Sequence, residues 1–472
     1  MNIFSTLISI HTLLKKAVAD FHEHKNVNTL CEQVRNGLFE LMEEFLPSII
    51  EKVLCDPELL PVLKAGAGRK GLRFNGCRST SIRLFTGKAL KIQSPYFAKS
   101  RSRHRGRKSK KRQNGTGQHI GLNYLGFINK CSTLLGSAVV QAALLCPSFE
   151  IARSNLKSHA IDLNVKTIHR ISTDLAEEAM AQRSRISIGP SDCADGKTVL
   201  ICIDGGRLRE RRAKRGRKRK GQKRQGFHAD WKEPIQFVIH IVDENGKISK
   251  DHLPLYDATM GDYDATMGDI DAAFNLLETY LRQMDISKAD RVVFCCDGAR
   301  SYWKRTGPLI KKLGISNHYE VIDYTHAKQN LHMIIDKLPQ KKSAKEKLQI
   351  ADAWKNLLWD GNLNTLKKEI IKHISSPKRC KEALVKFDNY FMKNSSRMQY
   401  ADFRKLNIPT GSGCVESAIR RVINFRLKSP GTFWKPETAE AMLFLRNQLL
   451  SGRWNLMIGN MFKQNRSLHA CN

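Results

Sequence analysis

The chain has 472 residues, 41% of them hydrophobic, which is enough for about two to four domains with buried cores. Its 80 Lys and Arg outnumber its 45 Asp and Glu, and the net charge of +35 favours a polyanionic partner such as nucleic acid over a merely soluble basic protein. The 12 cysteines include no C-x-x-C pair, which argues against a zinc site or a disulfide framework.

The N-terminus is apolar over a short run only. It lacks a basic flank and a cleavage site, and no apolar run in the chain approaches the length of a membrane span. We therefore expect a protein of the reducing cytosol. Residues 1–70 are predicted to be helical, because apolar residues recur at helical spacing at Leu30, Val34, Leu38, Leu41 and Phe45.

Residues 71–118 are predicted to hold a β-hairpin that turns near Thr86 and Gly87, followed by a basic linker. The linker, Lys99 to Arg112, contains nine Lys or Arg residues. It is either a solvated tail or an arm that contacts DNA.

Residues 119–190 are predicted to be helical again. Two short helices, near 148–156 and 164–172, resemble a helix-turn-helix, whose second helix would offer Lys166, Thr167, His169 and Arg170 to a DNA groove. An ordinary helical hairpin fits the same pattern equally well. The segment from Ser187 to Lys197 has the glycines and proline of a linker.

The pattern becomes rich in strands at residue 198. We expect strands at 198–203, 235–242, 247–254, 291–296 and 319–323, and helices at 270–284, 307–313 and 326–338. Three consecutive strands followed by alternating helices and strands predict an α/β ribonuclease-H-like core with a mixed sheet over 198–340. An all-helical insertion should fill 341–405, and 406–472 should complete the core with two further helices, the last at 436–455.

A seven-residue tandem copy interrupts this region. Tyr256-Asp-Ala-Thr-Met-Gly-Asp262 is followed directly by the same seven residues at 263–269. The copy is too short for a repeat architecture, so a recent in-frame duplication in a loop is the expected explanation.

Three acidic residues stand in short, distinctive phrases. Asp204 and Asp297 each end an apolar strand and precede a glycine, and Glu416 opens a helical pattern in Gly411-Ser-Gly-Cys-Val-Glu416-Ser-Ala. Three carboxylates of this kind can converge on two Mg²⁺ or Mn²⁺ ions and catalyse phosphodiester transfer. A single Asp-Gly is more often a turn, so the argument depends on both strand ends and the third phrase together.

These phrases resemble those of DDE transposases of bacterial insertion sequences. The resemblance covers most of 75–455, and its most specific part runs from Gly411 to Trp434. It implies that Asp204, Asp297 and Glu416 are catalytic and bind the metal ions. It also implies that Asp323 and His326, in a D-x-x-H phrase typical of Mutator-like relatives, lie beside the active site.

The resemblance further implies a bacterial, nucleoid-associated protein that binds double-stranded DNA, both terminal inverted repeats and target, as a homo-oligomer. The segment after Asp204 is expected to be a long cationic loop that grips DNA. The predicted DNA-binding residues, besides Lys166 and Arg170, are Arg207, Arg209, Arg211, Arg212, Lys214, Arg215, Arg217, Lys218, Arg219, Lys220, Arg420, Arg421, Arg426 and Lys428.

His228, Trp231 and Trp303 are candidates for stacking on bases, although buried packing is the usual role of a tryptophan. Two other functions stay open. One is an inactive or domesticated transposase that only binds DNA, which the seven-residue copy leaves possible; the other is a nuclease of the same fold, such as a resolvase.

Overall fold

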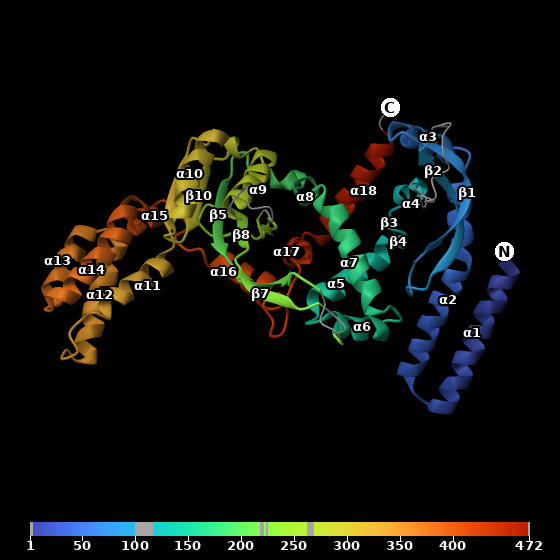
Figure 1. Cartoon of the computed structure of the whole chain (residues 1–472), viewed down its shortest axis with the longest axis horizontal. Coiled ribbons are helices and arrows are strands. Elements are labelled where there is room, and N and C mark those ends of the chain that lie inside the picture. Colours follow the sequence, from blue (N-terminus) through green and yellow to red (C-terminus); the bar gives the residue numbers. More distant parts are fainter. Residues whose placement is uncertain (1–2, 100–116, 218–220, 223–224, 262–268, 471–472) are drawn as a thin grey trace. The chain divides into compact units, whose positions relative to one another are not determined.

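The computed structural model describes residues 3–99, 117–217, 221–222, 225–261 and 269–470 (Figure 1). The chain forms two compact units. Unit 1 contains residues 1–182 and 458–472, and unit 2 contains residues 183–457. The predicted basic linker lies almost entirely outside the described residues. No helix in the described ranges is both long and apolar enough to cross a membrane.

Unit 1 begins with helices and a hairpin, as predicted. They are α1 (Ile3–His24), α2 (Val27–Leu54), α3 (Leu59–Arg69), β1 (Leu72–Ile82) and β2 (Leu90–Lys99). The turn of the hairpin is where the sequence placed it. There the Glu43 carboxylate accepts hydrogen bonds from the backbone N–H groups of Phe85 and Thr86, and Gly87 has a φ of +85°.

The rest of unit 1 is mainly helical. It contains α4 (Ile120–Tyr124), a small ladder of β3 (Phe127–Ile128) and β4 (Cys131–Ser132), then α5 (Thr133–Leu145), α6 (Phe149–Ser158) and α7 (Val165–Met180). Ser148 caps α6 and Asn164 caps α7, each through a side-chain oxygen that accepts a backbone N–H of the first turn. The two predicted helices are therefore confirmed, whereas their DNA-binding role stays a prediction.

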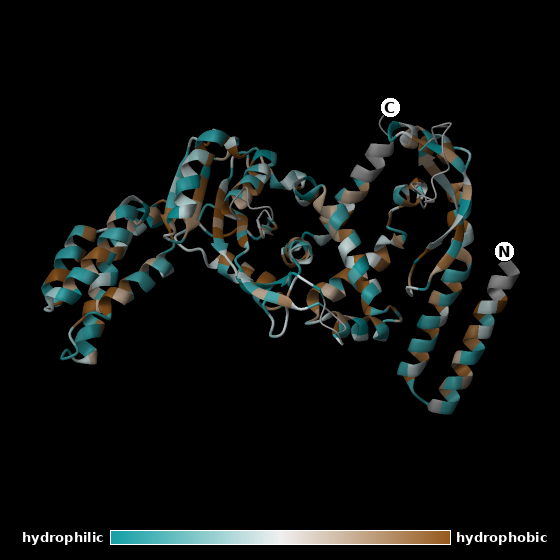
Figure 2. Cartoon of the chain, viewed as in Figure 1, coloured by the Kyte–Doolittle hydropathy of each residue, from teal (hydrophilic) through white to brown (hydrophobic). Residues whose placement is uncertain are grey.

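Unit 2 is built around a five-stranded mixed sheet. Its strands are β5 (Thr198–Gly205), β8 (Ile235–Val242), β9 (Leu255–Thr259), β10 (Arg291–Cys296) and β11 (His318–Ile322). The order is β11-β10-β5-β8-β9, with β10 parallel to both neighbours and β8 antiparallel to both of its own. This order and these directions are compatible with the predicted ribonuclease-H-like fold. The central strands are almost wholly buried and hydrophobic (Figure 2).

Helices cover the sheet and connect its strands. They are α9 (Asp269–Gln283), α10 (Arg300–Leu313), α11 (Tyr324–Ile335), α16 (Gly413–Ile419) with the π-helical turn η4 (Arg420–Asn424), and α17 (Pro436–Leu450). Helix α16 packs on β5 and β8, and α17 packs on β9. The expected last helix is two helices, because α18 (Trp454–Ala470) follows α17 after a turn at Gly452, whose φ is +80°.

The insertion between α11 and α16 is helical, as predicted. It consists of α12 (Ala344–Trp359), α13 (Leu363–His373), α14 (Pro377–Tyr390), η3 (Met392–Arg397) and α15 (Tyr400–Lys405). Helix α13 packs against both α12 and α14, and α11 contacts α12 and α14.

The third strand of the sheet is not where the sequence placed it. We expected 247–254, and the strand is β9, Leu255–Thr259. The first seven-residue copy is therefore not a loop: its residues Tyr256 to Thr259 are a buried strand, whereas most of the second copy lies outside the described residues. The strand was missed because it carries Asp257, a charge that only a tertiary partner makes tolerable in a core.

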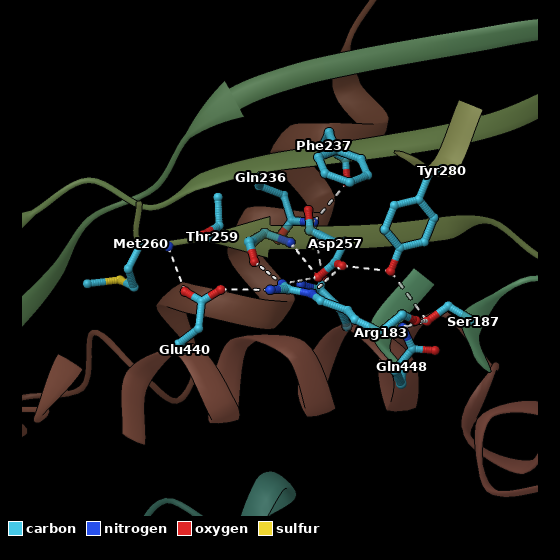
Figure 3. Close-up of polar contacts among 12 residues, drawn as sticks. Arg183, Ser187, Gln236, Phe237, Asp257, Thr259, Met260, Tyr280, Glu440 and Gln448 are labelled. Carbon is cyan, nitrogen blue, oxygen red and sulfur yellow. Dashed lines mark hydrogen bonds and ion pairs between the residues drawn. The ribbon is translucent and has the colours of Figure 1, made fainter. Parts of the chain in front are cut away.

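That partner is an arginine from the start of unit 2. Arg183, in α8 (Arg183–Ser187), donates to both carboxylate oxygens of Asp257 and to Glu440 of α17 (Figure 3). Tyr280 of α9 donates to Asp257 over 2.7 Å, and Glu440 accepts the backbone N–H of Met260. The network ties α8, α9 and α17 to the edge strand.

The segment from Ser187 to Lys197 is not a free linker either. It holds the turn η1 (Pro190–Asp192), and Asp192 forms a buried, two-bonded ion pair with Arg453. Ser187 is buried and accepts a hydrogen bond from Gln448. The glycines and proline therefore shape a packed turn.

The segment after Asp204, expected to be a long cationic loop, contains a hairpin in its described residues. Strands β6 (Leu208–Ala213) and β7 (Phe227–Lys232) pair antiparallel, with Arg209 opposite Trp231. The hairpin joins β5 to β8 (Figure 1). Trp434 exchanges backbone hydrogen bonds with Arg209 and Arg211, so the segment before α17 is laid along β6.

Candidate active site

Asp204 and Asp297 lie side by side at one edge of the sheet. Strands β5 and β10 are parallel neighbours in which Ile203 is opposite Cys296. Asp204 is the next residue of β5, and Asp297 directly follows the last residue of β10. Carboxyl ends of adjacent parallel strands form the edge at which open α/β sheets bind ligands. The register therefore brings together two of the three predicted catalytic residues.

The backbone after each aspartate is fixed by local hydrogen bonds. Asp204 Oδ1 accepts the N–H of Gly205 over 2.7 Å, and Asp297 Oδ1 accepts the N–H of Ala299 over 2.9 Å. Trp303 donates its indole N–H to the Asp297 carbonyl and is only 7% exposed. Trp303 therefore has the buried, structural role rather than a role in base stacking.

Glu416 approaches from helix α16. Its neighbour Val415 is buried against the sheet, and the Cys414 sulfur lies 3.5 Å from that of Cys202 in β5. Glu416 itself is exposed, and its charge acts on Asp204. The helix thus holds the third predicted catalytic residue within electrostatic range of the first.

Asp323 connects the start of the Glu416 helix to the sheet. It is buried, its N–H donates to the Cys296 carbonyl, and its Oδ1 caps α11 by accepting the His326 N–H over 2.8 Å. Its Oδ2 accepts both the backbone N–H and the hydroxyl of Ser412, the residue before α16. One carboxylate therefore sets the positions of two segments that border the site.

His326 lies in the first turn of α11, beside Asp323. Its Nδ1 lies 3.5 Å from Asp323 Oδ1. The pKa of His326 is raised by its contact with Asp323, against the opposing effect of burial, and further by the charges of Asp297 and Asp204. Asp323 and His326 thus lie close to Asp204 and Asp297, and their part in an active site stays a prediction.

The surroundings of Asp204 disfavour its ionised form, whereas those of Asp323 favour it. The pKa of Asp204 is raised to about 6, chiefly by burial and also by the charges of Asp297 and Glu416, while the Gly205 N–H and His326 act to lower it. Asp323 behaves in the opposite way. Although burial opposes ionisation, its hydrogen bonds from His326 and Ser412 lower its pKa to about 2. The ionised form of Asp323 is therefore stabilised by its surroundings, whereas the ionised form of Asp204 is destabilised and would be stabilised by a nearby cation.

The type of donor at the ends of β5 and β10 is the one that hard divalent cations prefer. Asp204, Asp297 and Glu416 supply carboxylate oxygens, the ligands Mg²⁺ and Mn²⁺ prefer, and their mutual repulsion favours a positive charge between them. Over the ranges that the structure describes, no three His, Cys, Asp or Glu side chains are already grouped to hold one ion.

Glu233 is a further carboxylate at the site that sequence reasoning missed. A Cβ added at Gly205 would overlap its Oε1, so Glu233 reaches the backbone beside Asp204. The buried Tyr302 feels the same group of charges: its pKa is raised by burial first, then by Asp297, Asp204 and Glu233. The only signal in the sequence was that Glu233 directly precedes the Pro234 that leads into β8.

The predicted DNA-binding cations near the site are mostly at the surface. On the hairpin, Arg207, Arg212, Lys214, Arg215 and Arg217 are exposed, and Arg209 and Arg211 are partly exposed; Lys218, Arg219 and Lys220 lie outside the described residues. Beyond Glu416, Arg420 and Lys428 are exposed and Arg421 is partly so, with a hydrogen bond to Tyr256.

Arg426 differs from the other predicted cations. It is 3% exposed, and its guanidinium lies 5.0 Å from the centre of the Trp434 ring, which is itself buried. It is therefore a packing residue in this structure, because its charge cannot reach a phosphate from that position. In unit 1, Lys166 and Arg170 are exposed on α7, as a role in DNA binding requires.

The cysteines agree with the sequence analysis. All eleven cysteines in the described ranges are free, and Cys295 and Cys296 are buried in β10 as apolar fillers.

Comparisons with known proteins give little beyond the geometry. No protein-family model matches the sequence, and no curated protein matches it. Among solved structures, a Drosophila P element transposase strand transfer complex aligns with 12% identity and a TM-score of 0.23, covering 71% of this chain and 83% of that chain. Overlap this weak does not establish a common fold.

Proposed function

We propose that this chain is a DNA transposase of the DDE type, which cuts phosphodiester bonds at the ends of an insertion sequence and joins them to target DNA. The observation that carries the proposal is the placement of Asp204 and Asp297 on adjacent strand ends, with Glu416 in electrostatic range. The resemblance of the three phrases to such enzymes supports the same function.

In this proposal the three carboxylates hold two Mg²⁺ or Mn²⁺ ions. When bound, such ions would make a water or a DNA 3′-hydroxyl more nucleophilic and would stabilise the charge on the leaving oxygen. Asp204 and Asp297 would contribute oxygens from the sheet edge, and Glu416 from the helix side. Asp323 keeps Ser412 and α16 in place, so that Glu416 approaches the pair in a fixed orientation.

The chain's own charge supports a DNA substrate. The exposed cations of the β6–β7 hairpin begin three residues after Asp204, so phosphates held by them would lie close to the aspartate pair. Residues of α7 would bind the terminal inverted repeats, and a homo-oligomer would bring two ends together. The surface position and the charge of the residues on α7 support the first of these roles.

An end-cleavage assay tests the proposal. The full chain is incubated in Mg²⁺ with DNA that carries the flanks of its own gene, and nicked, double-cut and strand-transfer products are separated. Asp297→Asn should abolish all products. The matched control is Asp290→Asn, which removes an exposed carboxylate at the opposite end of β10 and should cut normally. Equal cutting by both variants would exclude the assigned site.

The same assay separates the alternative functions. Nicks without joined products would indicate a nuclease of the same fold, and DNA binding without cutting would indicate an inactive transposase-derived protein. The seven-residue copy is a reason to test the last alternative, an inactive protein. A variant that lacks residues 263–269 would then show whether one copy suffices for cutting.

A further inference from the structure

The β6–β7 hairpin has two chemically different faces. Because neighbouring residues of a strand point to opposite sides, Leu208, Glu210 and Arg212 share one face with Lys232, Asp230 and His228. On that face Leu208 and Glu210 are buried, and Arg212 pairs with Asp230. The other face carries Arg209, Arg211, Phe227 and Trp231, and Phe433 from the segment along β6 adds to it.

On this second face, flat side chains lie one against the next. The Arg209 guanidinium lies 5.7 Å from the Trp231 ring centre and 4.7 Å from that of Phe433. Phe433 contacts Phe227 at 5.2 Å between ring centres, and Arg211 lies 5.0 Å from the Phe227 ring. We call these five residues the stacking face. It ends in Trp231, which is 59% exposed, although a tryptophan is usually among the more buried residues.

We propose that the stacking face binds unpaired DNA bases next to the cut, with Trp231 as the ring on which a base stacks. This inference rests on the proposed function and adds to it that the DNA bases bound beside the cut are unpaired. An exposed indole between cations suits a flat, aromatic and negatively charged ligand, because ring stacking and phosphate pairing then act together.

Unpaired bases fit this face better than a paired duplex does. Within a duplex each base face is covered by its neighbours, whereas a frayed or flipped base exposes the face that stacks on an aromatic ring. Exposed cations just beyond the end of β6, Lys214 and Arg215, would hold the adjoining phosphates. A purely electrostatic duplex site would have no use for an exposed tryptophan.

The stacking face follows the candidate active site closely along the chain. Arg209, which is opposite Trp231 in the hairpin, is five residues after Asp204, so the Cα atoms of Arg209 and Asp204 are at most about 18 Å apart. That distance corresponds to about five base steps along a strand. Bases held by Trp231 would therefore belong to the DNA being cut.

Equilibrium binding measured without divalent metal tests the inference independently of cleavage. The probes are fluorescein-labelled oligo-dT and a blunt duplex of equal length, in EDTA, with the full chain. Trp231→Ala should weaken oligo-dT binding about tenfold and duplex binding less than about twofold. Trp231→Phe should keep most of the oligo-dT affinity, because a smaller ring still stacks.

The matched control is Ile248→Ala, which shortens an exposed apolar side chain between β8 and β9 and should bind both probes like the parent chain. Unchanged oligo-dT binding by Trp231→Ala, or equal losses on both probes, would overturn the inference. So would a Trp231→Phe variant as weak as Trp231→Ala. Asp297→Asn, measured in parallel, should bind both probes normally; if it still cuts DNA in Mg²⁺, the proposed function fails while the stacking result stands.

Discussion

Asp204 and Asp297 are brought together by strand register alone: Ile203 lies opposite Cys296, and the two aspartates follow on neighbouring parallel strands. No hydrogen bond or counter-charge between their carboxylates is needed to explain this position. Burial at this end of the sheet, together with the charges of Asp297 and Glu416, raises the pKa of Asp204 to about 6. The predictions below follow from that charge and from the contacts around it.

Asp204→Asn should stabilise the metal-free protein while it removes activity. The folded state raises the pKa of Asp204 from 3.8 to about 6, so keeping it ionised above pH 6 costs up to about 3 kcal/mol of folding free energy. The substitution should therefore raise the Tm at pH 8. The gain should shrink as the pH falls from 6 to 4, because the carboxyl is then protonated in the folded and, finally, the unfolded state.

Thermal unfolding of Asp204→Asn and the parent chain at pH 4 and pH 8 measures this difference in Tm. The control is Asp251→Asn, an exposed carboxylate away from the site, which should change the Tm little at either pH. Mg²⁺ should raise the Tm of the parent chain and not that of Asp204→Asn. A lower Tm for Asp204→Asn at pH 8 would contradict the electrostatic account.

Asp323→Asn should impair cleavage through the position of Glu416. An amide in place of the carboxylate would direct its own N–H toward donors, either those of Ser412 or that of His326. We expect cleavage to fall about 10–100-fold and to require more Mg²⁺, while DNA binding is retained. Ser412→Ala, which loses only the hydroxyl donor, should have a smaller effect in the same direction.

Cleavage measured against Mg²⁺ concentration separates this role from a merely structural one. A loss of activity that Mg²⁺ cannot relieve, together with a lower Tm, would indicate that Asp323 only stabilises the fold. Asp323 also stabilises the fold above pH 4, because its pKa is lowered to about 2, and that contribution should disappear as the pH falls from 4 to 2.

The two copies of the repeated segment should respond differently to the same substitution. Asp257→Asn leaves Arg183 with one carboxylate instead of two in a buried site, which should cost about 3–5 kcal/mol of unfolding free energy. Asp264→Asn changes the equivalent residue of the second copy. Since Arg183 is already occupied by Asp257 and Glu440, we expect its effect to be within about 0.5 kcal/mol. Urea unfolding measures both, and equal losses would mean that both copies serve the core.

The sheet could be predicted from the sequence because its central strands are continuous apolar runs. Their order and the two strand-end aspartates followed from that pattern. Strand β9 could not be placed, because its central Asp257 becomes tolerable only beside Arg183, which is 74 residues away in the chain. The hairpin of β6 and β7 was hidden for a related reason, since its alternation is of arginines with other polar residues rather than of apolar with polar ones.

Roles that depend on tertiary proximity were also invisible in the sequence. Glu233 reaches the backbone beside Asp204 only because the hairpin returns to the sheet at that point. Ser412 meets Asp323 only because the insertion brings the chain back to α11. Conversely, Arg426 looked like a phosphate ligand because it is basic and near Glu416, but packing against Trp434 removes it from the surface.

The most direct test of the central claim, that the carboxylate of Asp297 binds a catalytic metal ion, is the metal dependence of Asp297→Cys in the end-cleavage assay. A thiolate binds Mg²⁺ poorly and softer ions better, so the variant should be inactive in Mg²⁺ and regain cutting in Mn²⁺ or Cd²⁺, while Asp290→Cys cuts in Mg²⁺. Full activity of Asp297→Cys in Mg²⁺, or no recovery with any of these ions, would contradict the account.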